Sequence, residues 1–182
     1  GFIYSKNDFN ISASYLSTNG DVSDPNSGGL ATDGAGSNGT VQLSYAPEQW
    51  GIAAAYNYGS TDNGVGLYSG NGTPFANNLQ AYGVTNSAAL SAWWMPEQSG
   101  FIPSFSMGWG INSTGDSSPD GTNPIKSSTS QSWYVGLQWD DAFLKGNALG
   151  FAVGQPTFVT SIDKRNSDDN FVADGNYAFE LF

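Results

Sequence analysis

The chain has 182 residues, with 5 Lys and Arg against 16 Asp and Glu, which gives a formal net charge of −11. Charged residues make up 12% of the chain, about half of their usual share. Cysteine and histidine are both absent, which excludes disulfides, thiolate chemistry, histidine acid–base catalysis and most zinc sites. The acidic balance cannot neutralise a phosphate backbone, so we expect no nucleic-acid partner. The length allows one domain or a piece of one.

Apolar residues recur at every second position, which is the period of a half-buried β-strand. Helical periodicity is not convincing anywhere. No apolar run reaches the 18 or more residues of a membrane-spanning helix, which excludes helical spans and leaves strand spans open. Eight segments carry the period of two, and we expect a strand in each: 9–16, 40–46, 51–58, 87–95, 101–111, 130–139, 148–154 and 177–182.

The connections between these segments alternate in length. Short turns are expected at 47–49, 96–100 and 140–146, and Pro-Glu-Gln recurs in the first two. Long segments rich in Gly, Asn, Ser and Asp lie between them, at 17–39, 59–86, 112–129 and 160–176. Short turns on one rim and long loops on the other are typical of outer-membrane β-barrels.

Aromatic residues cluster beside the short turns, while Ile, Leu, Val and Ala occupy the middles of the strands. Such a distribution is typical of an aromatic girdle at a membrane interface. The alternative is a soluble β-sandwich, in which Tyr and Trp are simply good strand formers and one face packs on a second sheet. A sandwich would carry more charge on its solvent-facing positions, whereas here those positions hold Ser, Thr, Asn, Gln, Ala and Gly. The expected girdle residues are Tyr45, Trp50, Trp94, Phe101 and Trp139.

We therefore predict an all-β fold, an antiparallel transmembrane β-barrel with about eight strands in this chain, short periplasmic turns and long extracellular loops. Residues 1–182 form a single barrel domain in this interpretation. The chain begins at Gly1 without Met, and the alternation of 177–182 stops without turn residues. We expect a fragment that is truncated at both ends.

Three segments resemble a known family. They are Asn147-Ala-Leu-Gly-Phe-Ala-Val-Gly-Gln-Pro-Thr-Phe158, Asp174-Gly-Asn-Tyr-Ala-Phe-Glu-Leu-Phe182 and the turn beginning Met95-Pro96-Glu97. Together they are similar to cyanobacterial outer-membrane porins, in which a carbohydrate-selective-porin-like (OprB-like) barrel follows an N-terminal surface-layer-homology domain. The resemblance covers most of the chain and implies that it is the C-terminal part of a barrel of more than eight strands.

The resemblance also implies a location and partners. It places the chain in the outer membrane of a Gram-negative-type, cyanobacterial cell, in contact with lipid and lipopolysaccharide. It implies transit of small inorganic ions, iron among them, and it does not transfer sugar specificity to this chain. A homo-trimer is allowed, and contact with peptidoglycan or the cell wall would run through the absent N-terminal domain.

Opposite the apolar positions lies a set of polar side chains, all but one of them neutral, that we expect to face the lumen of a pore. Hydroxyls and amides can replace water around a passing solute without trapping it. The expected pore-lining residues are Thr40, Gln42, Ser44, Asn57, Ser104, Ser106, Gln138 and Glu180.

Charge is concentrated in the long loops, where Asp62, Asp116 and Asp120 are expected to raise the local cation concentration. The adjacent pair Lys164 and Arg165 is a local exception. It marks a constriction or a lipopolysaccharide contact, or it is simply a solvated loop pair. The acidic loops lack the regular ligand spacing of a calcium loop, so we expect no metal site.

Catalysis is not expected. A glycosidase needs two carboxylates facing each other across a cleft, and Glu48 and Glu97 lie in the short turns. Barrel hydrolases that use Ser or Asp with His are excluded because the chain has no His. No cofactor is expected either.

The function predicted from the sequence is therefore an outer-membrane porin, a passive diffusion channel for small hydrophilic solutes and above all for inorganic ions. One alternative is a structural barrel that anchors the envelope and conducts little, since a small closed barrel fills its own interior. Another is a soluble glycan-binding β-sandwich. The total number of strands distinguishes the channel from the anchoring barrel. Solubility without detergent distinguishes the sandwich from these two membrane barrels.

Overall fold

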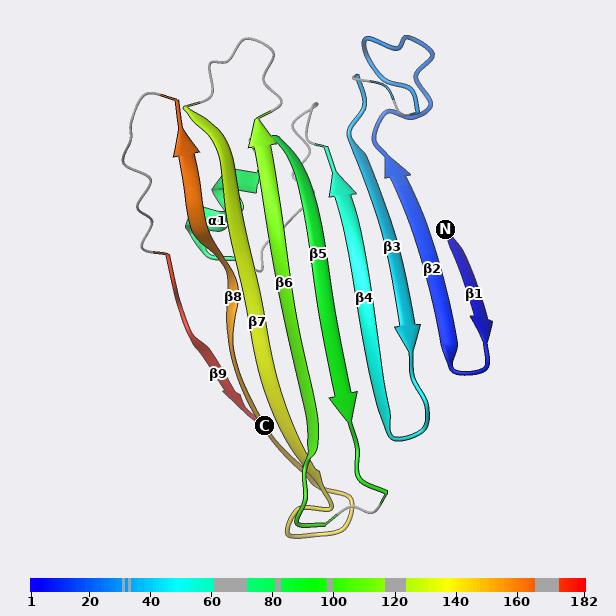
Figure 1. Cartoon of the computed structure of the whole chain (residues 1–182), viewed down its shortest axis with the longest axis vertical. Coiled ribbons are helices and arrows are strands. Elements are labelled where there is room, and N and C mark those ends of the chain that lie inside the picture. The colour runs from blue at the N-terminus through cyan, green and yellow to red at the C-terminus, as the bar shows by residue number, and fades with distance from the viewer. Residues whose placement is uncertain are drawn as a thin grey trace.

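The structure is a computed structural model, and it describes residues 1–30, 32, 34–60, 72–80, 83–97, 100–116, 124–165 and 174–182. It consists of one nine-stranded sheet and one short helix (Figure 1). Each strand pairs antiparallel with the next along the chain, so the predicted all-β antiparallel fold is confirmed. The elements are β1 (Phe2–Lys6), β2 (Phe9–Ser17), β3 (Ser37–Tyr45), β4 (Trp50–Gly59), α1 (Pro74–Gln80), β5 (Gly83–Trp94), β6 (Ser104–Asp116), β7 (Ile125–Asp140), β8 (Ala148–Lys164) and β9 (Ala178–Leu181).

The sheet is open, with β1 and β9 at its two edges (Figure 1). Nine strands replace the eight that the sequence predicted, because β1 was missed. Its residues Phe2, Ile3 and Tyr4 are consecutive apolar or aromatic positions and show no alternation. The strand nevertheless pairs with β2 through a tight turn in which Asn7 has a positive φ of 53°, a conformation that Asn tolerates.

Four strands extend well beyond their predicted segments, which shortens three expected loops. β5 begins at Gly83. β6 ends at Asp116, β7 begins at Ile125, and β8 continues to Lys164. Residues 112–116 and 127–130 are polar or glycine on both faces, so their apolar period vanishes while their backbone pairing continues. β8 runs on past Pro156 because the β7–β8 register shifts nearby, between Gln131 and Trp133, and such an irregularity accommodates a residue without an N–H.

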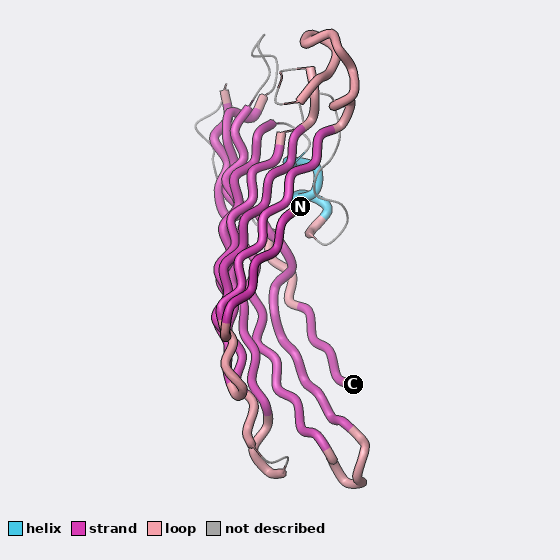
Figure 2. The backbone as a smooth tube through the Cα atoms, turned by 90° about the vertical axis from the view of Figure 1, so that its right-hand side faces the viewer, coloured by secondary structure: helices cyan, strands magenta, loops and turns pink. Residues whose placement is uncertain are grey.

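The predicted short and long connections lie at opposite ends of the sheet, but their lengths are not cleanly divided, because the connection 117–124 is shorter than the connection 95–103. Residues 7–8, 46–49, 95–103 and 141–147 connect strands at one end of the sheet, which we call the short-turn end (bottom of Figure 1). Residues 18–36, 60–82, 117–124 and 165–177 connect strands at the other, the long-loop end. The sheet curves so that β9 and α1 lie on the same side of the first strands (Figure 2).

The small apolar core lies between α1 and the upper part of β8. Ala76 and Leu79 of the helix bury against Val159 and Ile162, with Ile125 packed beside them. Among the helices that the structure describes, none is long and apolar enough to cross a membrane.

A hydrogen-bond network fixes the start of α1 to β8. Thr73 is 3% exposed; its Oγ1 accepts from the N–H of Ala76 at 3.1 Å and donates to Oδ2 of Asp174 at 2.6 Å. The same carboxylate accepts from the N–H of Val159 at 2.9 Å, and the N–H of Thr73 donates to the carbonyl of Thr157 at 2.9 Å. Thr73 thus caps the helix and joins it to the sheet.

Replacing Thr73 by Val keeps the shape of the side chain and removes both hydroxyl contacts. We expect Thr73→Val to lower the free energy of unfolding by about 1–2 kcal/mol, because a helix cap and a hydrogen bond to a charged group are lost. Thr160→Val is the matched control, since that hydroxyl lies on the exposed side of β8. Equilibrium denaturant unfolding measures both, and an equal loss in the two variants would contradict the role given to Thr73.

Candidate functional site

The two faces of the sheet differ in chemistry along their whole width. Antiparallel pairing without a shift from β2 to β6 keeps alternate residues in line, so that Leu43 pairs with Ala54, Ala54 with Leu90 and Leu90 with Trp109. One side, which we call the apolar face, extends across all nine strands. Its larger residues include Phe2, Tyr4, Phe9, Ile11, Tyr15, Val41, Leu43, Tyr45, Trp50, Ile52, Tyr56, Tyr58, Leu90, Trp94, Phe105, Met107, Trp109, Ile111, Trp133, Val135, Leu137, Trp139, Leu149, Phe151, Val153, Phe179 and Leu181.

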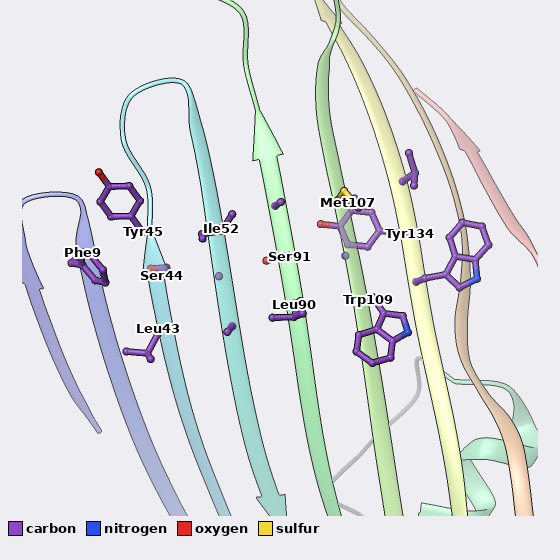
Figure 3. A pocket seen from close by; sticks show the side chains of 16 residues that line it. Phe9, Leu43, Ser44, Tyr45, Ile52, Leu90, Ser91, Met107, Trp109 and Tyr134 are labelled. Atoms are coloured by element: carbon purple, nitrogen blue, oxygen red, sulfur yellow. The ribbon is translucent and has the colours of Figure 1, made fainter.

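The apolar face is uncovered. Leu43 is 49% exposed, Ile52 53% and Leu90 57%, although these residues sit in the middle of the sheet. A shallow groove of about 650 Å³ runs across β2 to β7 on this face, and Figure 3 shows it edged by the rings of Phe9 and Tyr45. A contiguous apolar surface of this extent marks a site of contact with protein or lipid.

The opposite side, which we call the polar face, carries all eight residues that the sequence predicted to line a pore. Thr40 pairs with Asn57, and Ser104 with Gln138. Asn57 Nδ2 donates to Thr40 Oγ1 at 2.7 Å. Gln42 and Ser44 follow Thr40 at alternate positions of β3. Ser106 and Glu180 lie in one row across the sheet, because Ser106 pairs with Gly136, Gly136 with Ala152 and Ala152 with Glu180. The eight residues therefore share one face.

Helix α1 also lies on the polar face, at its long-loop end. Thr85 and Thr114 are buried there, and their hydroxyls are 2.9 Å apart. Ser128 and Ser130 on β7 are buried beside them. The sequence prediction treated 59–86 as a loop and missed this helix. Thr73 followed by Pro74 was the available signal, since a hydroxyl cap before proline is a common start for a helix.

The predicted girdle residues gather at the short-turn end. Tyr45 and Trp50 meet edge to face with ring centroids 5.5 Å apart, and Trp50 pairs with Trp94 on the next strand. Trp139 Nε1 donates to the carbonyl of Phe101 at 3.1 Å, while the Phe101 ring is 99% exposed. An aromatic band therefore borders the apolar face at this end.

The predicted loop charges are only partly described. Asp62 and Asp120 lie outside the described residues. Asp116 ends β6, Lys164 ends β8 and Arg165 follows it, all at the long-loop end. Lys126 lies on β7 at the same end and forms an ion pair with Asp163 at 3.9 Å. Three of the chain's 5 basic residues thus lie near this end of β7 and β8.

One loop carboxylate at this end has a perturbed pKa. The backbone N–H of Asn26 and the hydroxyl of Ser27 donate to Asp24, each at 3.0 Å, and these bonds hold the pKa of Asp24 below its usual value. The group therefore stays charged at neutral pH. It adds fixed negative charge to the 18–36 connection.

Two aromatic residues on the polar face were not among the predicted site residues. A Cβ added at Gly51 would lie 2.5 Å from Nε1 of Trp93, and one added at Gly108 would overlap the ring of Tyr134. Each ring therefore leans across onto a glycine of the preceding strand and lies along the sheet. The signal in the sequence was the pair Trp93 and Trp94, because adjacent strand residues point to opposite faces.

A scan against protein-family models and searches of curated proteins and of solved structures found no match. Within the part of the chain that the structure describes, no group of three or more Asp or Glu side chains is placed to hold a metal ion. The functional interpretation therefore stands on the two-faced sheet and its edges.

Replacing Gly108 by Ala tests the contact between strand and ring. We expect Gly108→Ala to lower the free energy of unfolding by about 1–3 kcal/mol, because the new methyl group forces the ring of Tyr134 away from the sheet. Gly115→Ala is the matched control on the same strand, since no atom lies within 4 Å of its added Cβ. Denaturant unfolding compares them, and equal stabilities would contradict the close packing of Tyr134 on β6.

Proposed function

We propose that this chain forms part of the wall of an outer-membrane channel, through which small hydrophilic solutes, inorganic ions above all, diffuse passively. The observation that carries the proposal is the exposed apolar face, which spans the sheet opposite a face of neutral polar and small residues. No catalytic group and no cofactor is needed for this function.

Lipid is the environment that suits the apolar face. In water, side chains such as Ile52 and Leu90 would leave most of their area solvated. Exposure of apolar surface to water costs about 25 cal/mol of free energy per Å². In the hydrocarbon of a bilayer the same surface does not contact water, so this free-energy cost is absent. Strand pairing satisfies the backbone N–H and C=O groups between β1 and β9, and pairing of these two edge strands with further strands would complete what a membrane-spanning sheet requires. The aromatic band at the short-turn end then lies at the periplasmic interface.

The polar face supports the role of a lumen. Hydroxyls and amides from Thr40, Asn57 and Ser106 present neutral donors and acceptors, which solvate an ion without binding it tightly. α1 covers the upper part of this face, held by Thr73 and Asp174, and would narrow the passage on the long-loop side.

The partners in this proposal follow the family resemblance. Outer-membrane lipid contacts the apolar face, lipopolysaccharide contacts the long-loop end, and solutes pass along the polar face. A homo-trimer and a cell-wall contact through a further domain belong to the same proposal.

The soluble sandwich is the weaker candidate. It requires a second sheet against the apolar face, and the described residues form a single sheet. An anchoring barrel would have the same outer surface as the channel and would differ in having an interior that is closed to solutes. Conductance therefore decides between channel and anchor.

The first prediction of the channel concerns current. Intact protein extracted with detergent and added to a planar lipid bilayer should give discrete conductance steps, because a polar lumen connects the two sides. Under a salt gradient the reversal potential should indicate cation preference, given the net charge of −11. Anion preference would be consistent with a pore and would contradict the inference that the negative charge of the chain selects for cations. Absence of steps from protein shown to be folded would favour the anchor.

The second prediction concerns the two faces, and adjacent residues of β5 provide a matched pair. Leu90 points to the apolar face and Ser91 to the polar face. In lipid vesicles Leu90→Arg should lower the free energy of unfolding by about 2–4 kcal/mol, the cost of a charge near the middle of the bilayer, while Ser91→Arg should change it little. If the protein were soluble, arginine at the 57% exposed Leu90 would be nearly neutral, and equal stabilities would contradict lipid contact.

A further inference from the structure

Three aromatic residues of the polar face line one hollow of about 360 Å³ near the short-turn end. Trp93 and Tyr134 lie along the sheet as described above. Phe182 lies opposite Gly150, with which it exchanges two backbone hydrogen bonds, and its ring occupies the space where a Cβ of Gly150 would be. Rings that lie along a wall can present a face to a molecule beside them.

One carboxylate lines the hollow and a second lies beside it. Asp140 lines it, and Gln138 Nε2 donates to Asp140 Oδ1 at 2.8 Å. Glu180 stands two residues before Phe182 on the same face and opposite Ala152, another lining residue. Both carboxylates are exposed.

Among the described residues, no basic side chain lines this hollow, although Lys145 lies in the exposed 141–147 turn that follows Asp140. Lys126, Lys164 and Arg165 lie at the opposite end of β7 and β8. A solute in the hollow therefore meets aromatic faces together with net negative charge.

We propose that this hollow binds organic cations, such as alkylammonium and guanidinium ions, on their way through the channel. The inference rests on the proposed function and names a class of solute for it. A weakly hydrated cation gains from the face of Trp93 or Tyr134 and from attraction to Asp140 and Glu180. A neutral solute of the same shape lacks both gains, and a small inorganic cation keeps its water shell between itself and the rings.

Two tryptophans on neighbouring strands provide the test, because Trp93 lies on the polar face and lines the hollow, whereas Trp50 lies on the apolar face and does not line it. Tetramethylammonium is titrated against the potassium current of intact protein in planar bilayers, and its apparent dissociation constant is measured. Trp93→Leu should raise that constant about two- to fivefold, and Asp140→Asn should raise it as well. Trp50→Leu should leave it unchanged, and Trp93→Phe, which keeps a ring, should restore most of the affinity. The neutral analogue tert-butanol should not reduce the current at the same concentration.

The outcomes separate this site from the channel itself. Channels that are insensitive to tetramethylammonium, equal losses in Trp93→Leu and Trp50→Leu, or equal effects of tert-butanol would overturn the cation site and leave the proposed channel unaffected. Folded protein that opens no channels would overturn the proposed function. In that case saturation-transfer NMR of tetramethylammonium with the protein in detergent decides on the site: a signal lost in Trp93→Leu and kept in Trp50→Leu supports it, and equal signals overturn it.

Discussion

The fixed register between neighbouring strands is the constraint on which the rest of the structure depends. Because side chains alternate with a period of two, a slip of one residue in any pair would send the apolar set of that strand to the polar side. The pairs from β2 to β6 run without a shift, so each strand inherits its orientation from the previous one. A face of a single chemistry across this width follows from register and alternation together.

The irregular part of the sheet is also the part where another element contacts it. The register shifts of the β7–β8 pair lie near residues 125–133, and α1 packs against the same stretch of β8 through Val159 and Ile162. β9 pairs only with residues 151–154 of β8. Beyond them the outer edge of β8 is met by Thr73, which donates to the carbonyl of Thr157, and by Asp174, which accepts from Val159. The segment that narrows the polar side thus also protects an edge that would otherwise expose free backbone groups.

How far the sequence predicts this arrangement depends on where apolar residues alternate. Strands such as β3 and β4 can be predicted from the sequence because Leu43 and Ile52 lie between small or polar neighbours. The eight polar-face residues are predicted by the same alternation. β1 and the ends of β6 and β7 cannot be predicted in this way. The first residues of β1 are apolar on both faces, and the ends of β6 and β7 are polar on both faces, so pairing with a neighbouring strand is what makes them strands. Helix α1 is stabilised by Asp174, about a hundred residues away, a contact that no local pattern contains. The leaning of Trp93 onto Gly51 is likewise a contact across strands.

The parity of the strands has a geometric consequence. In an antiparallel sheet odd-numbered strands share a direction, so β1 and β9, the two edges, both run toward the short-turn end. Joining them directly would make one parallel seam in an otherwise antiparallel wall. A cylinder with uniformly alternating directions must instead interpose an odd number of strands between them, whatever molecule supplies those strands, and its total is then even, as in bacterial barrels made of a single chain.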